Sequence, residues 1–172
     1  MKKHDPRCEG GKDDKVLADV EKFGWHVVKI LETDDSQGWA FSIGLFQTFG
    51  HPEVVVFGLN HDLMHSIINS IGEDIRSGKN FEINRQYDEL IEGYACTFKP
   101  VHQIWYAAFL GYANWYYGNF DYPTIQCLWP DKNNFFPWEP EFNSSWVWAQ
   151  PLLFNQDPES ARIVDLLRSL EA

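Results

Sequence analysis

The sequence predicts a single α+β domain: a largely antiparallel mixed sheet with helices packed on it, an aromatic-rich irregular C-terminal loop and a final helix. Its 172 residues are a length typical of one domain. Hydrophobic residues make up 44% of the chain, which fits a globular core. Strand-like and helix-like segments occur without a regular strand–helix–strand alternation, and this mixture favours α+β over α/β.

The domain organisation is predicted from composition. Residues 1–11 are charged and rich in helix-breaking residues, so we expect a mobile lead-in there. Residues 12–154 are expected to form the α+β domain. Residues 155–172 are expected to form a C-terminal helix that packs on the domain or extends from it.

The first predicted elements are a helix and a hairpin. Apolar residues recur at helical spacing over residues 12–23, and Gly24 is a natural stop. Residues 25–31 and 39–45 have extended patterns, and the polar residues between them are typical of a turn.

A buried strand and a well-marked helix follow. Residues 53–58 are almost wholly apolar, which is typical of a strand covered on both faces. Asn60 is a good N-cap for the next helix, whose apolar stripe extends to Ile75, and Gly78 closes it. Residues 94–101 are expected to form another strand.

The C-terminal half is dominated by aromatic residues. We predict a helix over 103–117 and a strand over 123–129. Residues 130–151 carry several prolines and large aromatic side chains, so we expect an ordered but irregular loop there. Asp157 at the N-cap and Pro158 at the first helical position are expected to open the final helix.

The charge of the chain limits its partners. Lys and Arg number 14 against 25 Asp and Glu, so the formal net charge is −11. Nucleic-acid backbones and anionic membranes require clustered basic residues, so the charge disfavours both as partners. A basic protein partner is compatible with it.

The sequence also predicts a cytoplasmic protein. No apolar run approaches the roughly 18 residues of a membrane span, and no apolar region follows the basic N-terminus as in a signal peptide. The three cysteines, Cys8, Cys96 and Cys127, are odd in number and far apart, which favours reduced thiols. Cys127 is expected to be buried and inert.

Several short blocks recur in the order and with the gaps of one known family. They are GWHVV at 24–28, WAFSIGL at 39–45, FGHPEVVVFGL at 49–59, QCLWPD at 126–131, FPW at 136–138 and QPLL at 150–153. With these blocks the chain resembles the bacterial family called domain of unknown function 4262 over roughly residues 8–154. The resemblance implies a compact cytoplasmic α+β domain with no established reaction, and it supplies no catalytic residues.

His51 and Glu53 form the first candidate catalytic site. They are two residues apart, so on an extended backbone both side chains point to the same side. A carboxylate beside an imidazole can tune a general base or complete a metal shell. In the alternative interpretation, His51 caps a loop and Glu53 binds backbone amides.

Asp131 is the third catalytic candidate. It follows the strand predicted over 123–129 and would meet His51 if both strand ends opened at one edge, giving an Asp–His pair. The alternative is a turn in which Asp131 caps the loop that follows it.

The predicted ligand-binding residues are Ser42, Gly44, His51 and Gln126. Ser42 can bind a ligand oxygen, and Gly44 allows backbone amides to approach a ligand closely. The segment lacks the flanking glycine of a nucleophile elbow. A tight structural turn is the alternative interpretation of these residues.

His61 and His65 are weak candidates for metal binding. Their i, i+4 spacing places both rings on one helix face, which suits a divalent metal, but the glutamate of the zinc-protease motif is missing. A solvated helix face is the alternative. No metal and no cofactor are therefore predicted.

Two functional hypotheses remain open. The aromatic residues of 105–148 belong either to the core or to an exposed surface with an acidic rim, as in tight protein interfaces. The leading hypothesis is a non-enzymatic protein-binding module, in the manner of an immunity protein that recognises a basic partner. The alternative is a small-ligand-binding protein or hydrolase-like enzyme with a site around His51, Glu53 and Asp131.

Overall fold

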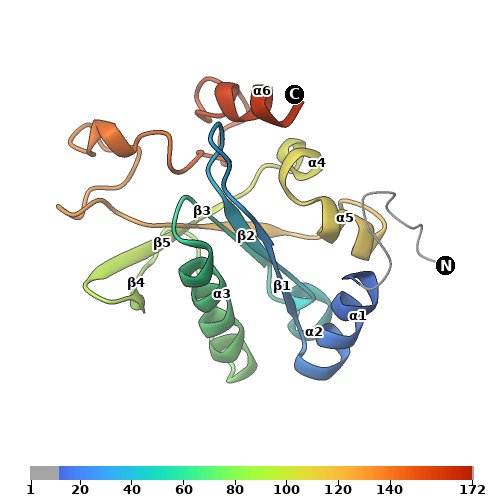
Figure 1. The fold of residues 1–172 in the computed structure, drawn as a ribbon. Helices are drawn as coiled ribbons and strands as arrows, with labels where there is room; N and C mark the ends of the chain where they lie inside the picture. The colour runs from blue at the N-terminus through green and yellow to red at the C-terminus, as the bar shows by residue number, and fades with distance from the viewer. Residues whose placement is uncertain (1–11, 172) are drawn as a thin grey trace.

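The computed structural model describes residues 12–171, and these form one mixed six-stranded sheet with helices on both faces (Figure 1). The elements in chain order are α1 (Lys12–Phe23), β1 (His26–Ile30), β2 (Trp39–Ile43), α2 (Leu45–Phe49), β3 (Glu53–Phe57), α3 (His61–Arg76), β4 (Gln86–Ile91), β5 (Tyr94–Pro100), the 3-10 helix η1 (Gln103–Trp105), α4 (Tyr106–Phe109), α5 (Gly111–Tyr117), β6 (Thr124–Leu128), the 3-10 helix η2 (Ser144–Trp146) and α6 (Val164–Glu171). The predicted α+β class is confirmed. The expected lead-in at residues 1–11, with Cys8, lies outside the described residues.

The strand order places β6, from the C-terminal half of the chain, beside β3. The order is β1-β2-β3-β6-β5-β4. All neighbours are antiparallel except β3 and β6, which run parallel with Glu53 opposite Thr124. Parallel strands begin at the same edge of a sheet and end at the opposite edge, and this relation decides which predicted site residues can meet.

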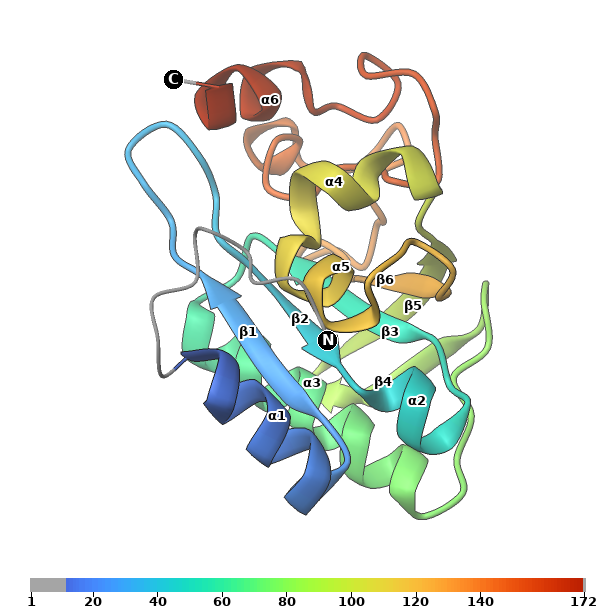
Figure 2. The ribbon, with the colours of Figure 1, turned by 90° about the vertical axis from the view of Figure 1, so that its right-hand side faces the viewer.

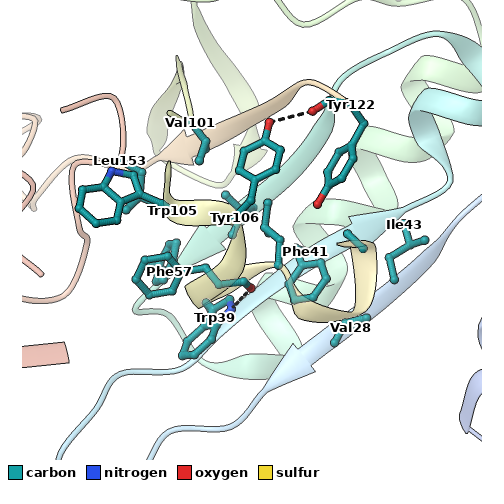
Figure 3. Packing of buried hydrophobic residues seen from close by; sticks show 14 of the residues in the cluster. Val28, Trp39, Phe41, Ile43, Phe57, Val101, Trp105, Tyr106, Tyr122 and Leu153 are labelled. Carbon is teal, nitrogen blue, oxygen red and sulfur yellow. Dashed lines mark hydrogen bonds between the residues drawn. The ribbon is translucent and has the colours of Figure 1, made fainter. Parts of the chain in front are cut away.

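The sheet separates two hydrophobic cores (Figure 2). Val54 and Val56 of β3 face α3, whereas Val55 and Phe57 face the layer that contains α4, α5 and α6. All four side chains are fully buried, which confirms the predicted strand covered on both faces. Figure 3 shows the core on the side of α4, α5 and α6, where the Trp39 indole donates a hydrogen bond to the Phe109 carbonyl at 2.9 Å.

The helix α3 follows its sequence signals closely. The Asn60 side chain accepts a hydrogen bond from the Asp62 amide at 2.9 Å, so the predicted N-cap is confirmed. None of the helices in the described part of the chain is both long and apolar enough to cross a bilayer.

One predicted helix is divided and one predicted strand ends early, in each case where the backbone changes conformation. The single helix predicted over 103–117 is wrong: it divides into η1, α4 and α5 around Leu110, which leaves helical geometry just before Gly111. The strand predicted over 39–45 stops at Ile43, because Gly44 adopts a φ of 107° and starts α2.

Two further differences lie in β4 and α6. The strand β4 was not predicted, since its sequence is mostly polar and only Tyr87 and Leu90 are buried in it. The predicted opening of the last helix at Asp157 and Pro158 is wrong. The Asp157 carboxylate accepts a hydrogen bond from the Ser160 amide in a turn, and Arg162 has a φ of 57°, so α6 begins only at Val164.

Candidate functional site

The Glu53 side chain accepts hydrogen bonds from several residues, which include the predicted ligand-binding residues Ser42 and Gly44. This side chain is 1% exposed at the start of β3. The carboxylate accepts hydrogen bonds from the amides of Gly44, at 2.8 Å, and Phe46, at 3.3 Å. The hydroxyls of Ser42 and Tyr117 also donate to it. We call these five residues the Glu53 cluster.

Within residues 12–171, the Glu53 carboxylate has no basic partner. Burial raises the pKa of Glu53, and the four hydrogen bonds from the cluster offset only part of this effect. Burial and the neighbouring Glu53 charge both raise the pKa of Tyr117, which keeps its hydroxyl protonated as a donor. All four bonds are of the charge-assisted kind when the carboxylate is ionised.

The turn at Gly44 orients the Ser42 hydroxyl and the amides of Gly44 and Phe46 toward the Glu53 carboxylate. A Cβ at Gly44 would lie 2.8 Å from the Gly24 carbonyl oxygen, so no larger residue fits the turn. Ser42 also accepts a hydrogen bond from the Val54 amide at 2.9 Å, which ties β2 to β3. The geometry therefore favours the structural interpretation, in which Glu53 binds backbone amides and Ser42 and Gly44 form a tight turn.

His51 lies on the other side of the sheet from the Glu53 carboxylate. Its Nδ1 donates to the Pro52 carbonyl at 2.8 Å, and its Nε2 accepts from the Phe81 amide at 3.2 Å. Phe81 belongs to the core beneath α3, whereas Tyr117 packs against the opposite core. The expectation that His51 and Glu53 share a side is wrong, because His51 precedes β3, which begins only at Glu53, and its ring bonds to Phe81 on the α3 side. Burial lowers the pKa of His51.

Asp131 does not meet His51. His51 precedes β3 and Asp131 follows the parallel strand β6, so they lie at opposite ends of these two strands. Asp131 accepts hydrogen bonds from the amides of Asn133, Phe135 and Asn143 at 2.9, 3.0 and 2.9 Å. Partial burial would raise its pKa, but these backbone bonds hold it below the ordinary value. The predicted Asp–His pair therefore does not form, and Asp131 instead caps the loop that follows β6.

The remaining ligand and metal candidates are also separated. Gln126 donates to the Pro151 carbonyl at 2.7 Å and accepts from the Leu153 amide at 3.3 Å, so it fastens the C-terminal segment to β6. His61 Nε2 lies 3.6 Å from Asp62 Oδ1, whereas the His65 ring is within hydrogen-bond distance of the Asn69 side-chain amide. Among residues 12–171, no three potential metal-ligating side chains are grouped for a metal ion.

The aromatic segment 105–148 is mainly core. Half of its sixteen aromatic residues are buried and five more are half-buried; the buried ones are Trp105, Tyr106, Phe109, Tyr116, Tyr122, Trp129, Phe136 and Phe142. Trp148 is the main exception, with 58% of its surface exposed. The expected aromatic surface is therefore reduced to a few rings, with Trp148 the most exposed of them.

Trp148 borders a shallow acidic hollow of about 620 Å³. The hollow is lined by Glu32, Thr33, Asp34, Asp35, Ser36, Gln37, Trp148 and Ala149, and we call it the Trp148 hollow. Thr33 and Ser36 bridge the hairpin loop through a backbone bond of 2.9 Å, which presents the two aspartates at the tip. The sequence indicated this turn, but nothing in it placed Trp148 beside the loop.

Contacts on either side of the hollow hold the backbone next to Trp148. The Gln150 side-chain amide makes two hydrogen bonds to the Trp129 backbone, at 2.9 and 2.8 Å. Ala149 packs so closely on Gly58 that a Cβ added to Gly58 would lie 2.2 Å from the Ala149 carbonyl oxygen. The Gly58 amide in turn donates to the Gly38 carbonyl at 3.0 Å, next to the hairpin. The backbone that carries Trp148 is thereby anchored beside the base of the hairpin.

Comparison with known protein families identifies a matching family model. A family model described as Domain of unknown function (DUF4262) matches residues 19–143. No curated protein and no solved structure matches the chain.

Proposed function

We propose that this chain, which belongs to the DUF4262 family, is a non-enzymatic protein-binding module that takes a basic side chain of its partner into the Trp148 hollow. One observation carries the proposal. Three carboxylates, Glu32, Asp34 and Asp35, line the same hollow as the exposed Trp148 indole, and no Lys or Arg is among its described lining residues.

The hollow offers the two contacts that an arginine side chain uses best. A guanidinium stacked on an indole gains about 0.5–2 kcal/mol, depending on how far it is desolvated. The carboxylates of Asp34 and Asp35 supply charge-assisted, bidentate hydrogen bonds to the same group. An arginine is therefore preferred over a lysine in the hollow.

The charge of the whole chain supports the same type of partner. A formal net charge of −11 attracts a basic protein and speeds its encounter, and it repels nucleic-acid backbone. The described cysteines Cys96 and Cys127 are buried free thiols, which fits a reducing compartment. We therefore propose a bacterial cytoplasmic setting, with an immunity-like role as the specific form of binding.

The proposed recognition is tested by calorimetric titration with a short arginine-rich peptide. Trp148→Ala and the double variant Asp34→Asn, Asp35→Asn should each weaken binding about tenfold, which corresponds to about 1.4 kcal/mol. The control is Asp88→Asn, Glu92→Gln, which removes the same charge from exposed positions in β4 and in the turn that follows it.

The control separates the hollow from general charge attraction. Replacing every arginine of the peptide by citrulline should abolish binding, since citrulline is neutral. If the control variant loses as much affinity as the two hollow variants, attraction by net charge explains the binding and the proposed site is wrong.

A further inference from the structure

A second hollow, of about 540 Å³, lies beside the outermost strand β1, between α1 and α3. It is lined by Lys15, Asp19, Phe23, Trp25, His26, Val27, Lys29, His65, Asn69 and Glu73, and we call it the His26 cleft. Its volume falls within the range of small-molecule sites, and it combines an apolar wall with several ionisable groups. It shares no residue with the Trp148 hollow.

His26 and Asp19 form a hydrogen-bonded pair in the cleft. His26 Nδ1 lies 2.7 Å from Asp19 Oδ2, and Lys15 Nζ lies 3.0 Å from the same oxygen. A carboxylate accepts only, so Nδ1 carries the proton and Nε2 of the neutral ring carries a lone pair. Burial lowers the pKa of His26 despite the Asp19 charge, which keeps the ring neutral near pH 7.

A second imidazole is held on the opposite wall. The Trp25 indole donates to Asn69 Oδ1 at 2.9 Å, which fixes the orientation of that amide. Asn69 Nδ2 then donates to the His65 ring, 3.3 Å from Nδ1. The polar groups of α3 are thus ordered before any ligand enters.

The cleft contains two lysines and two carboxylates, and these are not equally paired. Asp19 is engaged by His26 and Lys15, and Glu73 pairs with Arg76 at 3.2 Å. Among the described residues, the acidic group nearest to Lys29 Nζ is that of Asp62, 4.0 Å away. Lys29 is therefore the most weakly paired charge of the cleft within residues 12–171, and it favours an anionic ligand.

We propose that the His26 cleft binds a small organic acid that carries a hydroxyl or amino group on the neighbouring carbon and an apolar substituent. The acid group faces Lys29, the hydroxyl or amino group donates to His26 Nε2, and the substituent lies against Phe23 and Trp25. This site is independent of the protein-binding role proposed above. It needs only residues of α1, β1, the short link between them and α3.

Three related compounds test this assignment by NMR of the histidine rings. Mandelate carries the acid, the hydroxyl and the apolar ring; phenylacetate lacks the hydroxyl; phenylethanediol lacks the acid. Mandelate should shift the His26 and His65 ring signals saturably. Phenylacetate should bind about tenfold more weakly, since one hydrogen bond is missing. Phenylethanediol should bind least.

Two variants assign the contacts. Lys29→Met should weaken both acids about tenfold while leaving the Asp19–His26 pair intact. His26→Phe removes the Nε2 acceptor, so the preference for mandelate over phenylacetate should disappear. His61→Gln, which removes a half-exposed imidazole outside the cleft, should leave all three affinities unchanged.

The outcomes that overturn the proposal are equally specific. If none of the three compounds shifts the His26 or His65 signals saturably, the cleft is not such a site. If mandelate binds Lys29→Met as tightly as the unchanged chain, the assigned anion contact is wrong.

Discussion

The Tyr117 hydroxyl donates a hydrogen bond to the Glu53 carboxylate and so joins the last turn of α5 to the first residue of β3. The two residues are 64 positions apart in the chain. Because Glu53 also binds the amides of Gly44 and Phe46, one buried acid connects three separate parts of the fold. The stability of the domain should therefore depend strongly on this acid.

Removal of the acid should be costly. Glu53→Ala leaves buried amides and hydroxyls without an acceptor, and we expect a loss of about 3 kcal/mol in the free energy of unfolding. Tyr117→Phe removes one bond to a charged group and should cost about 1.5 kcal/mol. Urea denaturation measures both losses. Tyr94→Phe is the matched control, since the Tyr94 hydroxyl makes no hydrogen bond within residues 12–171; a loss in Glu53→Ala no larger than in this control would contradict the account.

The same acid should make stability depend on pH. Burial raises the pKa of Glu53 above the ordinary 4.5, so the folded state binds this proton more tightly than the unfolded chain. This contribution favours folding below the ordinary pKa and is lost as pH rises through the folded pKa. Relative to Glu53→Gln, the unchanged chain should therefore lose stability as pH rises from 4.5. A constant difference between the two proteins over that window would contradict the prediction.

Gly44 should tolerate no side chain. Gly44→Ala combines a φ of 107° with a contact of 2.8 Å to the Gly24 carbonyl oxygen, and we expect a loss of about 3 kcal/mol. Gly50 also has a positive φ, of 71°, but its Cβ would meet nothing within 4 Å. Gly50→Ala should therefore cost only about 1 kcal/mol. Thermal or urea unfolding of the two variants compares them directly, and equal losses would show that the close contact is unimportant.

The buried thiols should be unreactive in the folded protein. Cys96 and Cys127 are fully buried, and the hydrogen bond that the Cys127 thiol donates to Cys96, together with burial, raises the pKa of Cys127. In a Cys8→Ser background, Ellman's reagent should label neither thiol until the chain unfolds in urea, and then both. Rapid labelling before unfolding would mean that this part of the sheet opens locally.

His26 should titrate below the ordinary value of 6.5. Burial lowers the pKa of His26, and the Asp19 carboxylate opposes that effect. Asp19→Asn should therefore lower the pKa further, as followed by NMR of the ring, whereas Asp165→Asn in α6 should not change it. Because the folded pKa is depressed, the stability contributed by neutral His26 is complete above 6.5 and is lost as pH falls toward the folded pKa. A rise of the pKa in Asp19→Asn would contradict the pairing.

The elements that the sequence predicted well are those whose own residues have a clear strand or helix pattern. The buried strand β3 consists of consecutive apolar residues, and α3 has both a helical period and the Asn60 cap. The break at Leu110, the polar strand β4 and the late start of α6 depend on packing by distant segments. Such elements have weak or conflicting local patterns, so propensity alone does not locate them.

The candidate sites show the same division. Ser42, Gly44 and Glu53 were all marked by the sequence, but their shared acid–amide contacts depend on the turn at Gly44. The separation of His51 from Asp131 follows from the parallel pairing of β3 and β6, which no residue pattern specifies. For the same reason, the sequence did not place Trp148 beside Asp34 and Asp35 or Asp19 beside His26.

The most direct test of the proposed protein-binding role follows the indole N–H signals during titration with the arginine-rich peptide. Trp148→Phe identifies the Trp148 signal among those of the eight tryptophans. We predict that this signal and the backbone amides of Asp34 and Asp35 shift with one common midpoint, while the Trp146 indole stays unchanged. Peptide binding that shifts other residues and leaves Trp148 and the hairpin loop unmoved would contradict the proposed function.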